Sequence, residues 1–400
     1  MNILFLTLVK FNSINDRGLY TDLLRKFRDE GHQVSVVCPT ERREKQSTSL
    51  TKEESTSILK VKTFNIQKTN VFEKGIATLL IEYQYLSAIK KYFSETKFDL
   101  ILYSTPPITF SKVITYIKKR DNAYSYLLLK DIFPQNAIDM KMMKEKGFLH
   151  KMFLKKEKYL YQISDTIGCM SPANVDFVLN HNPEIPKSKV EVNPNSIEPI
   201  AFVQTHEERV KIRLQYQLPL DKKILIYGGN LGIPQGVEFL LKTMETCSSE
   251  DVFFLIVGSG TQYSLIEKWF QVNKPSNAKL VSGLPKNEYD ALLQACDVGL
   301  LFLNKNFTIP NFPSRLLSYL EMKIPVIAAT DKATDVGKVI EKNKCGFAAY
   351  SGDIKEMNQK IIQMVLQSPE EFNMMRENAY KLLLDSYTVT HSYNLIVEKL

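Results

Sequence analysis

Residues 224–236 contain the pattern that most restricts the fold of this chain. An apolar run, Ile-Leu-Ile-Tyr, stops at Gly228 and Gly229, and Gly232 follows soon after. From Val237 on, apolar residues recur at helical spacing. A buried strand that enters a helix through glycines leaves backbone N–H groups directed at one place, where the helix dipole also favours negative charge. We therefore predict that a nucleotide-type domain begins at mid-chain and that its first turn attracts phosphate.

The length of 400 residues exceeds the usual size of a single core, so we expect two domains. Both halves alternate short apolar strands with amphipathic helices, which is typical of parallel sheets covered on both faces. The predicted domains are residues 1–199 and 200–384, with the connection in residues 195–204. The fold class is therefore α/β, with two doubly wound domains.

Expected strands lie at residues 2–8, 34–38, 100–103, 125–129 and 166–170 in the first half, and at residues 224–227, 253–257, 279–282, 298–302 and 325–328 in the second. Residues 41–57 are rich in Lys, Glu, Ser and Thr and have little to bury. We predict that they form a surface loop.

Several classes of protein are disfavoured by the sequence. No apolar run approaches the roughly 18 to 20 residues that a membrane span needs, and residues 1–9 read as a core strand rather than a signal peptide. We therefore expect a cytoplasmic protein. The five cysteines and five histidines are scattered, without the spacing of a metal site. A mechanism without metal is the expectation.

The net charge of +8 lies entirely in the first half, since residues 1–200 hold 30 basic and 22 acidic side chains and residues 201–400 hold 22 of each. The first domain is expected to meet an anionic partner, such as a phospholipid surface, a phosphorylated acceptor or nucleic acid, although an ordinary solvated surface gives the same counts. No clear nucleic-acid motif is visible. Residues 140–158 combine seven lysines with two glutamates among apolar side chains. They either lie on an anionic bilayer or bury the apolar face beneath solvated lysines.

Two further segments of the second half point to an anion. Gly258 and Gly260 follow another expected strand. They either belong to the sheet edge at which ligands bind or form a simple turn between a strand and a helix. In the segment beginning at Pro310, Ser314 suits a helix N-cap, which places Arg315 in the first turn. A cation there disfavours the helix unless an anion shares the site, so Arg315 is either a phosphate ligand or an exposed surface arginine.

In the first half, Lys130 and Asp131 stand at the carboxyl end of an expected strand. Asp131 either positions a substrate hydroxyl and stabilises positive charge at a reacting sugar carbon, or serves as a helix N-cap. Other residues at neighbouring strand ends are expected to line the same cleft as Asp131: Ser104, Pro106, Asp16, Arg17 and Gly18.

Taken together, four segments resemble the family 4 retaining glycosyltransferases of the GT-B fold, and the likeness covers nearly the whole chain. They are Asp131-Ile-Phe-Pro-Gln-Asn-Ala, Tyr227-Gly-Gly-Asn-Leu-Gly, Leu284-Pro285 with Glu288 and Tyr289, and Pro313-Ser-Arg-Leu with Pro325-Val-Ile-Ala. They look most like bacterial capsule and O-antigen enzymes, and within that group they are similar to N-acetylfucosaminyl transferases. The resemblance implies two Rossmann-like domains that face each other across a cleft, with residues 385–400 as a helix crossing back to the first domain.

The resemblance also implies a nucleotide-sugar donor in the second domain and an acceptor in the first, with no cofactor or metal. The donor side would comprise Gly228, Gly229, Asn230, Gly232, Gln235, Gly258, Gly260, Leu284, Pro285, Glu288, Ser314 and Arg315. The family's Gly-Arg…Lys-Gly pattern falls on Gly229, Asn230 and Gln235, where both cations are missing, and Arg315 is expected to supply the charge.

Other parts of the family pattern are also absent. The two carboxylates of its Glu-x7-Glu motif would fall on Pro310 and Ser318, with Glu321 nearby but out of register. Many members place a histidine near the strand end that Lys130 and Asp131 occupy, and this chain has none there.

The preferred hypothesis is a hexosyltransferase that moves an N-acetylated sugar, with N-acetylfucosamine as the lead, from a UDP-sugar to a lipid-diphosphate-linked saccharide. It would act in capsule or O-antigen polysaccharide synthesis, peripherally at the inner face of the cell membrane, with retained configuration and with Asp131 and Arg315 as catalytic residues. A nucleotide-sugar epimerase of the same fold and an inactive UDP-sugar-binding scaffold protein are the alternatives.

Overall fold

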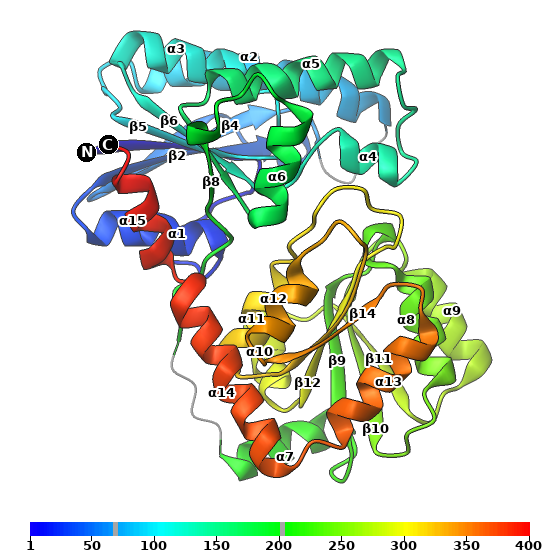
Figure 1. Ribbon diagram of the computed structural model, residues 1–400. Coiled ribbons are helices and arrows are strands. Elements are labelled where there is room, and N and C mark those ends of the chain that lie inside the picture. The colour runs from blue at the N-terminus through cyan, green and yellow to red at the C-terminus, as the bar shows by residue number, and fades with distance from the viewer. Residues whose placement is uncertain (67–70, 201–204) are drawn as a thin grey trace. The chain divides into compact units, whose positions relative to one another are not determined.

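The structure is a computed structural model that describes residues 1–66, 71–200 and 205–400, while the side chains of residues 71–76 and 79 lie outside the description. The chain divides into two compact units (Figure 1). The first unit consists of Met1–Glu198 with Thr388–Leu400, and the second consists of Pro199–Tyr387. Residues 201–204 of the predicted connection lie outside the described residues.

The first unit is built on one sheet of eight strands in the order β3-β4-β2-β1-β5-β6-β7-β8. Every neighbouring pair is parallel except β3 and β4. The strands are β1 (Asn2–Leu6), β2 (Gln33–Glu41), β3 (Ser49–Glu53), β4 (Thr56–Thr63), β5 (Leu100–Ser104), β6 (Tyr124–Leu129), β7 (Thr166–Cys169) and β8 (Val190–Val192). The helices are α1 (Leu19–Asp29), α2 (Val71–Tyr92), α3 (Ser111–Asp121), α4 (Gln135–Asp139), α5 (Phe148–Ile163), α6 (Pro172–His181) and α15 (Val389–Val397).

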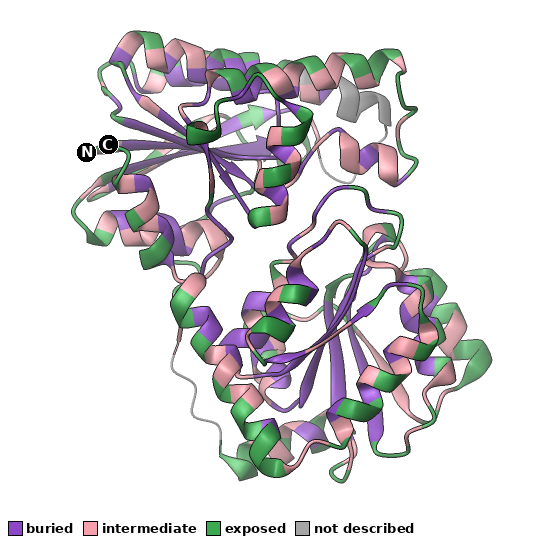
Figure 2. Cartoon of the chain, in the orientation of Figure 1, coloured by how far each residue is buried: buried purple, intermediate pink, exposed green. Residues whose placement is uncertain are grey.

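Helices cover both faces of this sheet, with α2, α3 and α5 on one face and α1 and α15 on the other (Figure 1). The inner strands are buried along their whole length, because both of their faces meet helices (Figure 2). Helix α15 packs beside α1 and contributes Val389 and Ile396 to the core that contains Leu23 and Phe27. The last helix of the chain is therefore part of the first unit.

The second unit has a fully parallel sheet of six strands in the order β11-β10-β9-β12-β13-β14. The strands are β9 (Lys223–Asn230), β10 (Val252–Ser259), β11 (Ala278–Ser282), β12 (Val298–Phe302), β13 (Val326–Thr330) and β14 (Gly346–Tyr350). The helices are α7 (His206–Gln215), α8 (Val237–Thr246), α9 (Tyr263–Asn273), α10 (Lys286–Gln294), α11 (Arg315–Glu321), α12 (Val336–Lys342), α13 (Ile354–Val365) and α14 (Pro369–Ser386).

The prediction of a surface loop over residues 41–57 is wrong. A short 3-10 helix at Arg42–Glu44 is followed by β3 and by the start of β4, which pair in antiparallel register. Strand β3 lies at the edge of the sheet and most of its side chains remain exposed. An edge strand is held largely by backbone hydrogen bonds, so a polar sequence can form one without burying much.

Two other edge strands were not predicted, β8 in the first unit and β14 in the second. Strand β8 has only three residues, and β14 reads Gly-Phe-Ala-Ala-Tyr, which carries little apolar volume. Both are fixed by the neighbouring strand rather than by a pattern of their own. The remaining predicted strands match the observed ones to within a few residues at either end.

Candidate functional site

The predicted glycine turn lies at the carboxyl edge of the second unit's sheet. Gly228 and Gly229 are near the end of β9, and Gly229 is paired with Gly258 on β10. Gly229 has a φ of +111°, which disfavours any residue with a side chain. A Cβ atom on Gly228 would lie 1.9 Å from the Tyr289 hydroxyl oxygen. Bare backbone is therefore required here, and the edge is the one at which open α/β sheets bind ligands.

Arg315 occupies this edge as the first residue of α11. Its guanidinium lies over the ring of Tyr227, with Cζ 4.3 Å from the ring centroid, and Nη2 donates to the carbonyl oxygen of Asn230 at 3.4 Å. The same carbonyl accepts the Tyr227 hydroxyl at 3.0 Å. The interpretation of Arg315 as an ordinary exposed surface arginine is wrong, because its guanidinium is held against the turn.

One nitrogen of this guanidinium is unused. Nη1 of Arg315 is buried and has no hydrogen-bond partner within the described residues. Gly229 lies against the same group, since a Cβ atom there would be 3.8 Å from Nη2. A buried N–H donor without an acceptor costs free energy of about 1–3 kcal/mol, so the arrangement favours an anionic ligand that completes it.

Tyr319 fixes the strand beneath the turn. Its fully buried hydroxyl accepts the N–H of Gly228 at 3.3 Å and lies 3.1 Å and 3.2 Å from the carbonyl oxygens of Leu300 and Ile226. Burial raises the pKa of this hydroxyl, so it stays protonated and can donate to a carbonyl. Tyr319 is one helical turn after Arg315, and it joins β9 to β12.

The other predicted donor residues divide into two groups. Asn230 Nδ2 and the N–H of Gly232 both donate to Oε1 of Gln235, at 3.0 Å and 3.1 Å, so these three residues brace the turn. Gly260 directly follows the neighbouring strand β10, and a Cβ atom there would lie 2.4 Å from the carbonyl oxygen of Leu231.

The second group lies around α10 and α11. Leu284 and Pro285 lead into α10, and Glu288 is exposed in its first turn, where its charge acts on Tyr216. Ser314 stands at the N-cap position of α11 as predicted, but its side chain makes no capping hydrogen bond, because its backbone is already helical.

Glu321 does not replace the missing family carboxylates. Its side chain is buried, and Oε1 accepts the N–H of Ile200 at 3.1 Å. Glu321 therefore binds the first residues of the second unit through the N–H of Ile200.

In the first unit, Asp131 and Lys130 follow β6 at the carboxyl edge of the sheet. The Thr105 hydroxyl accepts both of their N–H groups, at 3.3 Å and 3.2 Å, and donates to the carbonyl oxygen of Asp131 at 2.8 Å. Asn136 Nδ2 donates to Oδ2 of Asp131 at 2.8 Å. Asp131 is not a helix N-cap, since α4 begins after Pro134.

The two ionisable side chains are both shifted toward their neutral forms. Burial raises the pKa of Asp131 to about 6, although the hydrogen bond from Asn136 opposes the shift. Burial lowers the pKa of Lys130 to about 7, and its Nζ lies 3.5 Å from the carbonyl oxygen of Asn193. Near neutral pH this strand end can therefore hold or release protons, as acid–base chemistry requires.

Ser104 lies next to this pair at the end of β5, and Pro106 follows it in the adjacent turn. Burial raises the pKa of Tyr20, while a hydrogen bond with Ser104 lowers it and the charge of Asp131 raises it further. Tyr20, Ser104 and Asp131 therefore lie close together, although they come from three separate segments of the chain.

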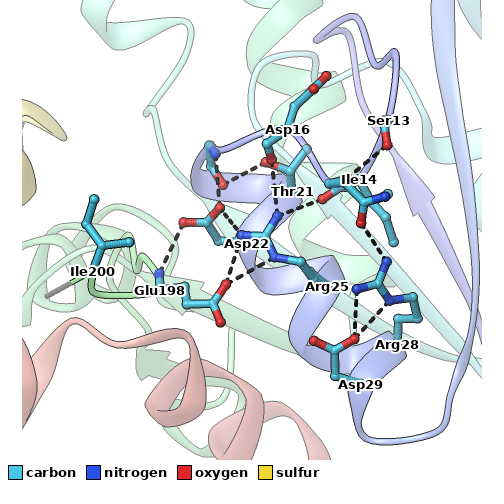
Figure 3. A network of polar contacts seen from close by, with 12 residues as sticks. Ser13, Ile14, Asp16, Thr21, Asp22, Arg25, Arg28, Asp29, Glu198 and Ile200 are labelled. Carbon is cyan, nitrogen blue, oxygen red and sulfur yellow. Dashed lines mark hydrogen bonds and ion pairs between the residues drawn. The ribbon is translucent and has the colours of Figure 1, made fainter. Parts of the chain in front are cut away.

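Asp16 and Gly18 belong to a network that holds the start of α1 (Figure 3). The N–H of Gly18 donates to Oδ1 of Asp22 at 3.0 Å, and the carbonyl oxygen of Asp16 accepts Arg25 Nη1 at 3.2 Å. Arg25 also pairs with Asp22 and Glu198, at 2.7 Å and 2.9 Å. The N–H of Gly18 thus already has an acceptor within the protein. Arg17, which stands between Asp16 and Gly18 in the sequence, is partly buried.

Within residues 1–66, 71–200 and 205–400, no three His, Cys, Asp or Glu side chains are grouped as metal ligands. No helix in that same part of the chain is long and apolar enough to cross a bilayer.

The fold and these sites define a two-domain α/β protein of the GT-B class. Sucrose-phosphate synthase of Thermosynechococcus elongatus superimposes with a TM-score of 0.74 at 15% identity, over 99% of this chain and 97% of that chain. HepE of Anabaena, solved in complex with UDP, gives a TM-score of 0.69 at 15% identity, over 100% and 99% of the two chains. At these identities the likeness shows the fold.

Residues 208–382, which lie within the second unit, match the family model of glycosyl transferases group 1. The probable glycosyltransferase WbjE of Pseudomonas aeruginosa is 20% identical over 286 residues, which are 72% of this chain and 70% of that protein. The putative colanic acid biosynthesis glycosyl transferase WcaI of Escherichia coli (strain K12) is 29% identical over 175 residues, 43% of this chain and 42% of that protein.

Some residues of the two sites were not singled out from the sequence. Tyr319 stands four positions after Arg315, which is the helical spacing that could have found it. Asn136 lies within the Asp131-Ile-Phe-Pro-Gln-Asn-Ala segment that carries the family resemblance, but no role was predicted for its side chain. Tyr20 offers no such signal, because only the sheet order brings it to Ser104.

Proposed function

We propose that this protein is a glycosyltransferase that moves an N-acetylated sugar from a UDP-sugar to a lipid-diphosphate-linked saccharide in bacterial polysaccharide synthesis. The observation that carries the proposal is the buried Nη1 of Arg315, which has no hydrogen-bond partner among the described residues, on a guanidinium next to Gly229 in a range that matches group 1 glycosyl transferases. N-Acetylfucosamine is the sugar we would test first, in capsule or O-antigen synthesis.

In this proposal, Arg315 binds the diphosphate of the donor. A guanidinium held by a ring and a carbonyl is already oriented, so it stabilises the charge on the departing diphosphate without reorganisation. The backbone N–H groups of the glycine turn add further donors. These groups do the work that a metal ion does in other enzymes, and we propose that no metal is needed.

Transfer breaks the bond between the sugar carbon and the phosphate oxygen and forms a bond from that carbon to the acceptor oxygen. With retained configuration, the departing phosphate oxygen takes the proton of the acceptor hydroxyl on the same face of the sugar. Asp131 orients the sugar in its ionised form, which is available above a pKa of about 6. We assign acceptor binding to Lys130, Ser104 and Pro106 at the same edge.

A lipid-linked acceptor would require the protein to reach a bilayer. We therefore propose that it works peripherally at the inner face of the cell membrane. The basic excess of residues 1–200 supports an anionic surface as the partner of the first unit.

The proposal is tested by incubating the purified protein with a panel of UDP- and GDP-sugars and a short lipid-diphosphate saccharide, with and without a chelator. We expect one UDP-sugar to be consumed only when the acceptor is present, at the same rate in chelator, with a product of unchanged anomeric configuration. A second sugar formed from the UDP-sugar alone would show an epimerase instead. UDP binding without transfer to any acceptor would show an inactive scaffold protein.

A further inference from the structure

Residues 142–149, which run from the loop after α4 into the first turn of α5, expose three large apolar side chains. Phe148 is 83% exposed, Met142 is 74% exposed and Leu149 is 54% exposed. Single exposed apolar residues are ordinary on protein surfaces, but a local group of them marks an interaction site. We call residues 141–151 the 141–151 patch.

The structure separates this patch from the buried part of the same basic stretch. Met140 is buried, and the ring of Phe153 packs edge-on against Phe133 with centroids 5.1 Å apart. The interpretation as a buried apolar face holds for the later part of α5, whereas its first residues, Phe148 and Leu149, leave their side chains in solvent. The bilayer interpretation stays a prediction.

The exposure does not come from a loose segment. The N–H of Met142 donates to the carbonyl oxygen of Ala137 at 2.8 Å, and the N–H of Lys146 donates to Nδ1 of His150 at 2.9 Å. The backbone is thus ordered by its own hydrogen bonds while the side chains of Met142 and Phe148 point to solvent.

The charges around the apolar side chains have one dominant sign. Lys141, Lys144, Lys146 and Lys151 are all exposed, and none of them forms an ion pair within the part of the chain that the structure describes. Glu145 is the one acidic residue of the patch. Four solvated cations thus surround the apolar group.

We propose that the 141–151 patch is a docking surface for an anionic lipid bilayer. Phe148, Met142 and Leu149 would enter the boundary between headgroups and acyl chains, while the lysines reach the lipid phosphates. An anionic bilayer fits the patch because it offers acyl chains to the three exposed apolar side chains and phosphates to the four exposed lysines at the same time. This docking surface rests on the proposed function, because a lipid-linked acceptor is what requires the protein to bind a membrane.

Sedimentation with vesicles tests this surface. One set contains phosphatidylcholine alone, and the other contains phosphatidylcholine mixed with phosphatidylserine. The wild type should bind the anionic set, and added salt should weaken binding because it screens the lysines. Replacing Phe148 and Met142 by serine should lower the partition coefficient at least about tenfold, and Lys144→Gln with Lys146→Gln should lower it by about tenfold and flatten the salt dependence.

Matched control variants lie in the second unit. Val272→Ser and Leu366→Ser remove side chains that are 71% and 76% exposed, and Lys268→Gln with Lys355→Gln removes two exposed charges. These variants should bind vesicles like the wild type. UDP affinity, measured in parallel, should be the same for every variant, so a failure of the donor site would be seen separately from a failure of the patch.

Three results would overturn the inference. Equal binding to neutral and anionic vesicles, or no binding to either, removes the role of the lysines. An equal loss of binding in patch and control variants removes the role of the patch. Concentration-dependent self-association that Phe148→Ser abolishes, without an effect on vesicles, would assign the patch to a second copy of the chain.

Discussion

Arg315 and Asp131 show how much of a site depends on the groups that hold one side chain. Arg315 is oriented by Tyr227 and by the Asn230 carbonyl, and Asp131 by Asn136 and Thr105. The sequence predicted Asp131 at the end of an apolar strand and Arg315 in the first turn of a helix, because an apolar run and a helix N-cap are both visible without structure. Their partners were not predictable in the same way, since those contacts depend on strand order and on helix rotation.

The raised pKa of Asp131 predicts a gain in stability when its charge is removed. Ionisation is disfavoured in the folded protein, where the pKa is about 6 rather than 3.8, so Asp131→Asn should increase the free energy of unfolding by about 1–2 kcal/mol above pH 6 after allowing for partial exposure. The gain should fall as pH drops from 6 and vanish only below the unfolded-state pKa of 3.8, where the carboxyl group is protonated in both states. Urea unfolding across that range measures it, and a gain independent of pH would contradict the assignment. Transfer activity should be lost at every pH.

The buried hydroxyl of Tyr319 predicts a second effect at this scale. Tyr319→Phe leaves the N–H of Gly228 and the carbonyl oxygen of Leu300 without this partner, so stability should fall by about 1–3 kcal/mol. The glycine turn should also bind UDP less tightly, because Gly228 is no longer fixed. Calorimetry with UDP checks this, with Tyr263→Phe on α9 as the control. An unchanged UDP affinity in Tyr319→Phe would show that Tyr319 stabilises the core without affecting the binding of UDP.

At the scale of elements, most strands with their own apolar run were predictable, whereas the edge strands β3, β8 and β14 and the interior strand β4 were not. Strands β9, β10 and β12 each bury a continuous run and appear where the sequence places them. Strands β3 and β14 take their structure from a neighbour, so a polar or small-residue sequence gives no sign of them. The sheet edges that carry the candidate sites were predictable, because they come directly after inner strands with a continuous apolar run.

A buried ion-pair network joins α7 to the second sheet and gives a prediction for this scale. Asp297 accepts Arg213 Nη2 at 2.6 Å and the N–H of Ile224 at 2.7 Å, and it also pairs with Arg209. Asp297→Ala leaves Arg213 buried and uncompensated, which should cost about 3–5 kcal/mol. The fluorescence of Trp269, the single tryptophan, follows unfolding of this unit. Exposed Asp251→Ala is the control, and equal midpoints for the two variants would contradict the prediction.

At the scale of the whole molecule, the chain builds two separate cores and returns to the first one at Thr388. Length and the repeated strand–helix pattern were enough to expect two domains. The contribution of α15 to the first core was expected from the family resemblance rather than from its own pattern, since a short terminal helix does not reveal its partner.

The placement of α15 predicts a selective effect. Ile396 is fully buried in the first core, so Ile396→Ala should lower the stability of the first unit by about 2–5 kcal/mol. Hydrogen exchange should rise in α1 and β2, while the unfolding transition seen by Trp269 keeps its midpoint. His391→Ala, on the exposed side of the same helix, should change neither. Faster exchange throughout the second unit would contradict two independent cores.

The most direct test compares the binding of UDP and uridine by calorimetry in the wild type, in Arg315→Met and in Arg42→Met, whose arginine is exposed in the first unit. If Arg315 binds the diphosphate, Arg315→Met should lose about 10- to 100-fold in UDP affinity, as expected for a charge-assisted hydrogen bond, and keep its affinity for uridine. Arg42→Met should bind both as the wild type does. Equal losses for UDP and uridine, or no loss for UDP, would contradict a diphosphate site at Arg315.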